Sequence, residues 1–353
     1  MKKKEILFGS ILAILTCVFV LCLVELTLRV KHHKFALTNF VEENWNLATW
    51  EFPIQHDTKL GWIPKERYTT SSKDSKVTLT ILNKGIRANG PDTFRRSNNK
   101  ERVLAVGAST VFGSQVSDNE TWPALLEKEA NQEVLNGGVF AYGLDQVILR
   151  LDQLIPELRP SRVILGIHPD NFNQVTMSQK YGKKPYFEVV GNTLVLRNTP
   201  VPPTKKELTS YQKTMGYSYL AHYLLSKLSP QFWLESHGEI KVHNQEREVS
   251  CLLLKEYSRL CAANKMKCSI LFQYFKTTVP EARNKVLALN SCIDKSSVKI
   301  WDTYQPLETV KANNPILYDS FFDFHMTPKG NAWVASYIKD RINTENETSS
   351  PHL

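Results

Sequence analysis

The sequence lacks the signatures of several large protein classes. Its 353 residues contain no internal repeat, no low-complexity tract and no glycine-rich loop of the phosphate-binding type. Neither a repeat protein nor a P-loop nucleotide site is therefore indicated. No pair of cysteines has Cys-x-x-Cys spacing, which argues against a structural zinc site. We predict no metal and no cofactor.

Concentrated charge is also missing. The formal net charge is +9 at pH 7, a value that would suit a polyanionic partner. The basic residues are nevertheless spread along the chain without a nucleic-acid-binding motif, and their tightest cluster is Lys2 to Lys4. A hydrophobic content of 42% and a charged content of 22% are ordinary for a folded protein. The composition predicts one large domain or two, and no nucleic-acid partner.

A long uncharged run lies near the amino end, from Ile6 to Val24. As a helix this run is about long enough to cross the hydrocarbon core of a bilayer, and its apolar character continues weakly past Glu25. The three lysines before it are what the positive-inside rule expects of a cytoplasmic amino end. No Ala-x-Ala-like cleavage site ends the run, so we favour an uncleaved single-pass anchor over a signal peptide. Residues 6–28 would contact the lipid bilayer, with residues 31–353 outside the cytoplasm, in the periplasm or at the cell surface.

The cysteines beyond residue 30 fit such a compartment. They are Cys251, Cys261, Cys268 and Cys292, and an oxidising environment would permit disulfides among them. Four cysteines allow three full pairings, and the sequence does not choose among these. Cys251 and Cys261 lie ten residues apart on one expected helix, so they should not pair with each other.

From residue 101 onward the pattern alternates between short apolar runs and amphipathic segments. We expect strands at 102–106, 133–136, 162–167, 267–273 and 297–301. We expect helices at 122–130, 144–158, 250–263, 279–291 and 330–342. Such alternation is typical of a parallel, doubly wound α/β sheet. The predicted organisation is a cytoplasmic tip and transmembrane anchor over 1–30, a lead-in over 31–100, an α/β domain over 101–342 and a tail over 343–353.

An insertion interrupts the expected α/β domain at about residues 174–249. Within it, residues 185–196 have the pattern of a hairpin that turns at Gly191-Asn192. Residues 217–228 predict an aromatic helix. Because the insertion leaves the carboxyl end of a strand, it could form a substrate-binding wall or lid. A plain elaboration of the scaffold is an equal alternative.

A turn of small residues, Gly107-Ala108-Ser109-Thr110, follows the first expected strand of the α/β domain. Open α/β sheets bind their ligands at the carboxyl ends of the strands. A turn of this kind leaves a serine hydroxyl accessible, beside backbone N–H groups that can face an oxyanion. By itself the tetrapeptide is also compatible with an ordinary β-to-α turn.

A serine needs a base to become a nucleophile, and histidine is the usual base. Of the nine histidines, only His325 combines a nearby acid, Asp323, with a following helix that starts at a glycine. An acid close to the histidine can fix its tautomer and stabilise the imidazolium. We therefore predict Ser109, His325 and Asp323 as nucleophile, base and orienting acid.

These blocks together resemble the SGNH (GDSL-like) hydrolases, a family named for active-site Ser, Gly, Asn and His residues in separate blocks. The nucleophile block here has Ala108 where the family usually has Asp. In the second block, Ala141 stands where the family has a glycine whose backbone N–H serves the oxyanion hole. The last block, Asp323-Phe324-His325, has the Asp-x-His spacing of the alginate O-acetyltransferase branch.

The resemblance covers roughly residues 60–175 and 298–342. It implies a flavodoxin-like parallel sheet with helices on both faces, the SGNH hydrolase fold, here preceded by one transmembrane helix.

The third block departs most from the family pattern, which is Gly-x-Asn-Asp with an Asn side chain that completes the oxyanion hole. Aligning the family Asp with Asp170 puts Pro169 at the Asn position, and proline has no N–H to donate. We expect Asn171 or Asn173 to supply the missing donor from a shifted loop. His168 is the further candidate.

The resemblance implies an extracytoplasmic serine esterase that removes acetyl or another short acyl group from a carbohydrate or a lipid. The same acyl-enzyme would serve an O-acyltransferase with a sugar hydroxyl as acceptor, and a membrane anchor suits such modification of an envelope glycan. The third alternative is a catalytically weak relative that binds a glycan or a partner. It is suggested by Ala108, Pro169 and Phe322, which replace polar residues of the family.

Overall fold

The computed structural model describes residues 2–42, 53–70, 77–90, 101–130, 132–205, 207–235, 237–276 and 280–349. The chain divides into two compact units. The first, here called the helical unit, comprises residues 1–52, 179–182 and 204–240. The second, here called the α/β unit, comprises residues 53–178, 183–203 and 241–353. Two short strands, β8 (Met177–Gln179) and β11 (Ile240–Lys241), lie where the chain passes from one unit to the other.

A five-stranded parallel sheet forms the centre of the α/β unit. Its strands are β5 (Arg102–Gly107), β6 (Glu133–Asn136), β7 (Arg162–Ile167), β12 (Lys267–Phe272) and β13 (Val298–Asp302). They lie in the order β13-β12-β7-β5-β6, which is the flavodoxin-like order 2-1-3-4-5 when the strands are numbered along the chain. The inner strands are buried on both faces, which explains why their sequences are mostly apolar.

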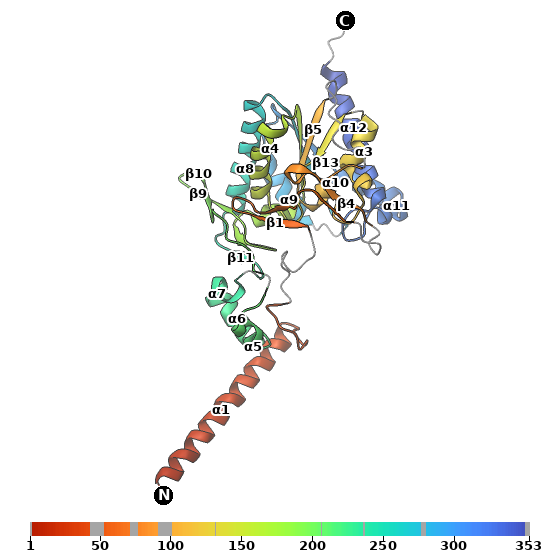
Figure 1. The fold of residues 1–353 in the computed structure, drawn as a ribbon. Helices are drawn as coiled ribbons and strands as arrows, with labels where there is room; N and C mark the ends of the chain where they lie inside the picture. Colours follow the sequence, from red (N-terminus) through yellow and green to blue (C-terminus); the bar gives the residue numbers. More distant parts are fainter. Residues whose placement is uncertain are drawn as a thin grey trace. The chain divides into compact units, whose positions relative to one another are not determined.

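Helices cover both faces of this sheet (Figure 1). On one face α4 (Leu144–Leu158) packs against α8 (Glu246–Ala263), and on the other α3 (Trp122–Ala130) packs against α12 (Pro328–Ser349). The predicted fold, a parallel sheet with helices on both faces, is confirmed. Each expected strand agrees with the observed one to within one residue at either end.

The other elements of the α/β unit are short. The strands are β1 (Ile54–Asp57), β2 (Gly61–Pro64), β3 (Tyr68–Thr70), β4 (Leu79–Ile81), β9 (Tyr186–Val190) and β10 (Thr193–Arg197). The helices are α2 (Ser109–Phe112), α9 (Pro280–Leu289), α10 (Tyr304–Asn313) and α11 (Pro315–Ser320). The 3₁₀ turns are η2 (Asn83–Gly85), η3 (Asp118–Glu120), η4 (Pro169–Gln174) and η5 (Asn290–Cys292). The β9–β10 hairpin turns at Gly191 and Asn192, both at positive φ, as the sequence predicts.

Two disulfides stabilise the α/β unit. Cys251 in α8 is bonded to Cys292 in η5, and Cys261 near the end of α8 is bonded to Cys268 near the start of β12. Cys251 and Cys261 share one helix and have different partners, so the prediction that they do not pair is confirmed.

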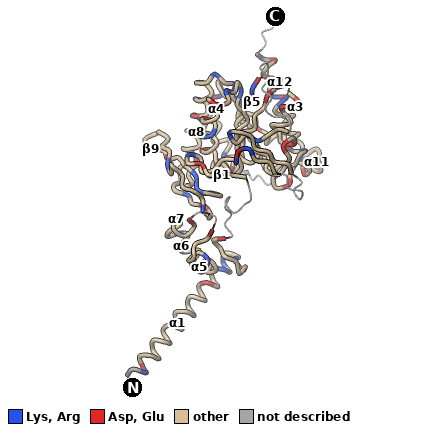
Figure 2. Tube along the Cα trace, in the orientation of Figure 1, with Lys and Arg blue, Asp and Glu red and all other residues tan. Residues whose placement is uncertain are grey.

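The helical unit contains α1 (Lys2–Lys31), α5 (Ser210–Met215), α6 (Tyr219–Leu228) and α7 (Pro230–Leu234). From Lys4 to Lys31, α1 is long and apolar enough to cross a membrane, with a mean hydropathy of 2.9 in its most apolar stretch. Figure 2 shows charged residues only towards the two ends of α1. The core of the unit is formed by Val41, Trp233, Leu234 and Ile240.

Candidate active site

Ser109 lies where the strand order of the sheet reverses. β5 has β6 on one side and β7 on the other, and in open α/β sheets a crevice forms at such a point, outside the carboxyl ends of the strands. Gly107 and Gly166 lie opposite each other in β5 and β7. A Cβ at these positions would lie 2.3 and 2.4 Å from the Val111 side chain. The two glycines therefore let α2, which begins at Ser109, pack directly over the junction of the two strands.

His325 contacts the Ser109 hydroxyl from the far end of the chain. Its Nε2 lies 2.9 Å from Ser109 Oγ, although the two residues are 216 positions apart. A bridge between Phe322 and Met326 closes the turn that contains His325, and the Asn331 amide donates to the Met326 carbonyl. Ser109 and His325 are both half-buried. The structure thus brings together the nucleophile and the base expected from the sequence.

The side chain that contacts the other ring nitrogen of His325, Nδ1, is the amide of Gln115. Gln115 Oε1 accepts the backbone N–H of His325 at 2.6 Å and lies 3.1 Å from Nδ1. Because a backbone nitrogen only donates, the Gln115 atom beside it is the oxygen, and Nδ1 carries the proton that this oxygen accepts. In the neutral ring Nε2 is then unprotonated and can accept the Ser109 proton. Gln115 thereby fixes the tautomer that a general base requires.

Asp323 lies outside this arrangement. Its side chain is exposed, and its backbone N–H donates to the His325 carbonyl at 2.9 Å. The tight turn thus joins the two residues through their backbones. Within the described part of the chain, the Asp323 carboxylate makes no hydrogen bond to the His325 ring. The structure does not bring this predicted site residue to the base, and Gln115 occupies the corresponding place.

Burial makes His325 a neutral base. The pKa of His325 lies below its usual value, because the protonated ring would lose its hydration on burial. The Phe275 ring meets the His325 ring edge to face, with 5.4 Å between centroids. The ring that contacts Ser109 is therefore unprotonated at neutral pH, as proton abstraction requires.

His168 directly follows β7 on the other side of the junction. Its ring stacks on Phe275 at 3.9 Å, the same aromatic ring that meets His325. The Asp170 N–H donates to His168 Nδ1 at 3.3 Å, which favours the tautomer with its proton on Nε2, and the Asp170 carboxylate lies 3.5 Å from the same Nδ1. Among the described residues, this Nε2 is buried without a hydrogen-bond partner. A buried donor without a partner costs about 1–3 kcal/mol. The Nε2–H group of His168 is such a donor.

Electrostatics keep His168 uncharged. Burial lowers the pKa of His168 to about 4, and Asp170 opposes this shift while His325 adds to it. His168 is therefore neutral under the conditions in which His325 acts as a base.

Asn171 and Asn173 lie on η4, and their amides contact other groups. Asn171 Nδ2 donates to the Tyr142 carbonyl at 3.0 Å, and its Oδ1 accepts the His168 N–H at 2.8 Å. Asn173 Oδ1 accepts from Lys285 Nζ at 2.9 Å. The Asn171 amide thus joins the loop after β6 to the residue that follows β7, and so fixes the position of His168.

The loop after β6 runs beside the nucleophile turn. The Val139 N–H donates to the Gly107 carbonyl at 3.0 Å, and a Cβ on Gly138 would lie 2.4 Å from the Phe112 nitrogen. Ala141 follows with a φ of 64°, a left-handed conformation that glycine adopts most easily. The backbone at Ala141 therefore has the conformation that favours the glycine found there in the SGNH pattern.

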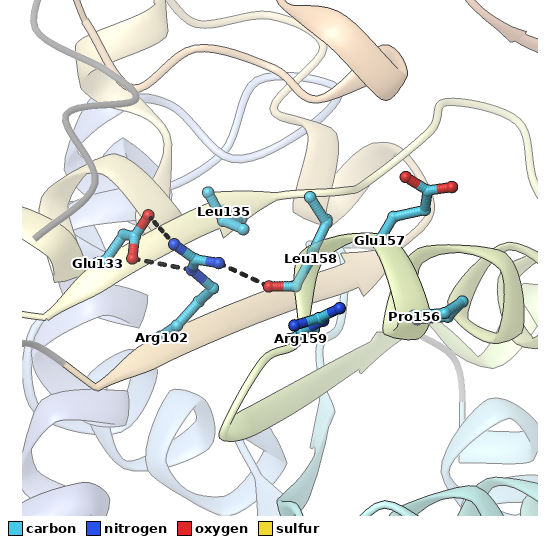
Figure 3. Close-up of a pocket in the computed structure, with 7 residues that line it drawn as sticks. All are labelled: Arg102, Glu133, Leu135, Pro156, Glu157, Leu158 and Arg159. Carbon is cyan, nitrogen blue, oxygen red and sulfur yellow. Dashed lines mark hydrogen bonds and ion pairs between the residues drawn. The ribbon is translucent and has the colours of Figure 1, made fainter. Parts of the chain in front are cut away.

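The pocket drawn in Figure 3 lies at the opposite end of the sheet, where β5 and β6 begin. Arg102 donates to both carboxylate oxygens of Glu133 and to the Leu158 carbonyl. These polar groups are hydrogen-bonded to one another. The pocket is far from the carboxyl ends of the strands, where Ser109 lies, so it is not part of the candidate active site.

Sequence reasoning missed Gln115. Its signal in the sequence was only its closeness to Ser109. The sequence offers His168 only as a further candidate after Asn171 and Asn173, because alignment of the third block through Asp170 puts Pro169 at the Asn position. Alignment through Gly166, near the end of β7, puts His168 at that position.

No family model and no curated protein matches this chain. One similar solved structure is a protein from Desulfitobacterium hafniense described as lipolytic and of the G-D-S-L family, with 12% identity, 68% of this chain and 99% of that chain covered, and a TM-score of 0.39. A psychrotrophic esterase from Pseudoalteromonas sp. has 9% identity, covers 70% of this chain and 100% of its own, and has a TM-score of 0.39. An acetylxylan esterase from Geobacillus stearothermophilus has 13% identity, with 69% and 94% covered and a TM-score of 0.39.

Proposed function

We propose that the α/β unit is a serine esterase that removes a short acyl group, such as acetyl, from a carbohydrate or a lipid. The observation that supports this most is the 2.9 Å contact between Ser109 Oγ and a His325 ring whose other nitrogen is bonded to Gln115. A serine hydroxyl on an unprotonated, half-buried imidazole is the arrangement that nucleophilic catalysis needs.

In this mechanism Ser109 Oγ attacks the ester carbonyl while its proton moves to His325 Nε2. The protonated ring then donates that proton to the leaving alcohol, which leaves an acyl group on Ser109. A water molecule attacks the acyl-enzyme while His325 Nε2 takes one of its protons. His325 then returns that proton to Ser109 Oγ as the bond to the acyl group breaks, which releases the acid and restores the serine and the neutral base. Gln115 accepts the Nδ1 proton throughout and positions the ring. It adds no negative charge against the imidazolium, so Gln115 stabilises this cation less than a carboxylate would.

Three donors would hold the oxyanion that forms during attack. Two are the backbone N–H groups of Ser109 and Ala141, as expected from the sequence. The third is His168 Nε2–H, which takes the role expected of Asn171 or Asn173. The support for His168 is the Asp170 N–H that faces its Nδ1, its neutrality and its unpaired, buried Nε2. A donor set in advance in a site without water stabilises developing charge strongly.

An exposed aromatic ring beside the base supports a substrate with an apolar face, such as a sugar ring. Phe324 is 74% exposed, and its centroid is 4.9 Å from that of His325. Aromatic side chains are common in the lining of ligand sites.

The location proposed for this esterase is the outer side of a membrane, with α1 as the anchor. The lysines that precede the apolar run support a cytoplasmic amino end. The two disulfides of the α/β unit support an oxidising compartment for the remainder of the chain.

The test is covalent labelling of the full chain in detergent with a fluorophosphonate probe. Wild type should react and Ser109→Ala should not. Ser161→Ala is the matched control, because Ser161 bonds the Arg102 backbone at the far end of the sheet, and it should label like wild type. A folded wild-type chain that neither labels nor hydrolyses p-nitrophenyl acetate would instead favour the binding-protein alternative. Supplying a glycan acceptor with the acyl donor separates transfer from hydrolysis, since a transferase would acylate the glycan faster than water.

A further inference from the structure

The start of α6 is fixed to the carboxyl end of α1 by one carboxylate. Glu25 accepts the N–H groups of Tyr219 and Leu220 at 2.8 and 2.7 Å, and the Ser218 hydroxyl at 3.0 Å. These are N–H groups that a helix leaves unpaired at its first turn. Arg29, one turn further along α1, donates to the Tyr217 carbonyl at 2.7 Å. Figure 1 shows α6 beside this end of α1.

The depth of Glu25 follows from the length of the apolar run. At about 1.5 Å per residue, the helix from Ile6 to Val24 spans about 29 Å, close to the hydrocarbon thickness of about 30 Å. If α1 crosses the membrane, Glu25 is the first residue beyond the hydrocarbon core. The first turn of α6 is then at the same depth, in the headgroup layer.

The helical unit has apolar side chains on its outside as well as in its core. On α6, Leu225 packs against the core, whereas Leu224 and Leu228, one turn apart on another face, are 44% and 77% exposed. Similar exposed residues follow on α7 and in the segments next to α1. The exposed large apolar residues of segments 31–37 and 217–232, here together called the outer patch, are Phe35, Leu37, Tyr217, Leu224, Leu228 and Phe232. A helix that is apolar on more than one face is usually covered on each of them.

Charge favours lipid over protein as the cover. The two segments that contain the outer patch, residues 31–37 and 217–232, include three lysines and no acidic residue. Lysines that flank an apolar face suit the phosphate groups of a bilayer surface. A second copy of the chain would instead bring like charges together.

From the hydrogen bonds of Glu25 to the start of α6, the depth of α1 and the exposed side chains, we propose that the outer patch is immersed in the headgroup and upper acyl-chain layer of the bilayer. The helical unit is then a second membrane contact that lies in the interface, in addition to the spanning helix. This inference rests on the proposed anchoring by α1, and it is independent of the chemistry at Ser109.

The test uses the full chain in vesicles of equal parts phosphatidylcholine and phosphatidylglycerol. Cys17 and Cys22, the free cysteines, are replaced by serine, and single cysteines are introduced for an environment-sensitive fluorophore. Leu228→Cys reports on the outer patch, and Phe232→Cys is a second position there. Leu287→Cys is the matched control, because Leu287 is also an exposed leucine but lies on α9 of the α/β unit. Leu15→Cys reports on the middle of α1. Circular dichroism of each sample verifies that the variant is folded, and fluorophosphonate labelling of Ser109 is recorded separately as a readout of the proposed esterase.

We expect the emission of the fluorophore to be blue-shifted at positions 228 and 232. Lipids brominated near the headgroup should quench the fluorophore several-fold more at these two positions than at position 287. The control should be quenched by aqueous iodide. Iodide quenching at 228 and 232 equal to that at 287, with position 15 still quenched by mid-chain bromine, would overturn the inference and leave the anchor intact. Shielding from both quenchers would also overturn it, since a protein would then cover the patch. Loss of bromine quenching at position 15 would overturn the anchoring itself, while Ser109 labelling would still report separately on the esterase.

Discussion

Replacing Gln115 by glutamate would place a carboxylate against the His325 nitrogen that now faces a neutral amide. Gln115 Oε1 lies 3.1 Å from Nδ1, and an opposite charge within about 4–6 Å shifts a pKa by about 1–3 units towards the charged form. In wild type, burial lowers the pKa of His325. Only the unprotonated ring can accept the Ser109 proton, so activity falls as the pH drops through this pKa. Wild type should therefore lose activity only below about pH 6.5, and Gln115→Glu should move that loss about 1–3 units higher.

Above this pH range the Gln115→Glu variant should be faster than wild type. The carboxylate would stabilise the imidazolium that forms as Ser109 attacks. Suppose that the pKa of His325 rises by about two units and that half of this change stabilises the transition state. The activation barrier then falls by about 1.4 kcal/mol, which is a factor of about ten in rate. Gln115→Ala removes the acceptor that fixes the tautomer, and should lower kcat by about 100-fold or more.

The assay is kcat/KM for p-nitrophenyl acetate as a function of pH, with the full chain in detergent. Asp323→Asn is the discriminating variant. It removes an exposed carboxylate that makes no hydrogen bond to the ring within the described residues, so it should leave the profile unchanged. The opposite pattern, with activity lost in Asp323→Asn and kept in Gln115→Ala, would refute the assignment of Gln115 and restore the acid expected from the sequence.

Three further results are expected. His168→Ala should lower kcat by about 100–1,000-fold with little change in KM, whereas Asn173→Ala should keep wild-type turnover. Equal turnover in the two variants would mean that backbone N–H groups alone hold the oxyanion. Gly138→Ala should destabilise the fold by about 1–3 kcal/mol, seen as a lower Tm, because its Cβ would lie 2.4 Å from the Phe112 nitrogen, and an unchanged Tm would contradict that packing. Alkaline phosphatase fused after residue 40 should be active, since it needs export to form its disulfides, and a stable but inactive fusion would invert the proposed orientation.

The scaffold was predictable because its signals are local. β5, β7 and β12 are apolar because both faces of each are buried, and α4 has a continuous apolar stripe for the same reason. Gly191-Asn192 specified a hairpin because both positions need positive φ. The disulfide partners depend on where η5 and the start of β12 lie in space, which residue spacing does not encode.

The candidate site was predictable only where one residue type is required. A serine esterase of the proposed kind needs a serine and a histidine, so the sequence proposes Ser109 and His325 from their blocks, and the structure brings the two side chains into contact. The group on Nδ1 needs only an acceptor oxygen at the right place, and Gln115 meets this need from a loop 210 positions away from His325. Similarly, an oxyanion donor can be any N–H group, so a family pattern written for asparagine does not point to His168, the donor proposed from the structure.

The Glu25 contact with α6 has a consequence for how the chain is made. Glu25 and the Ser218 hydroxyl that it binds are 193 positions apart, and a ribosome adds about 5–20 residues per second. After the first helix has left the ribosome, about 10–40 seconds therefore pass before its partner is synthesised. During that interval the Glu25 carboxylate can bind Arg29 on its own helix, water or lipid headgroups, but not the first turn of α6. The helical unit can close only after residue 218 has been made, around a helix that is already in place, and the α/β unit, which needs residues 241–353, is completed later still.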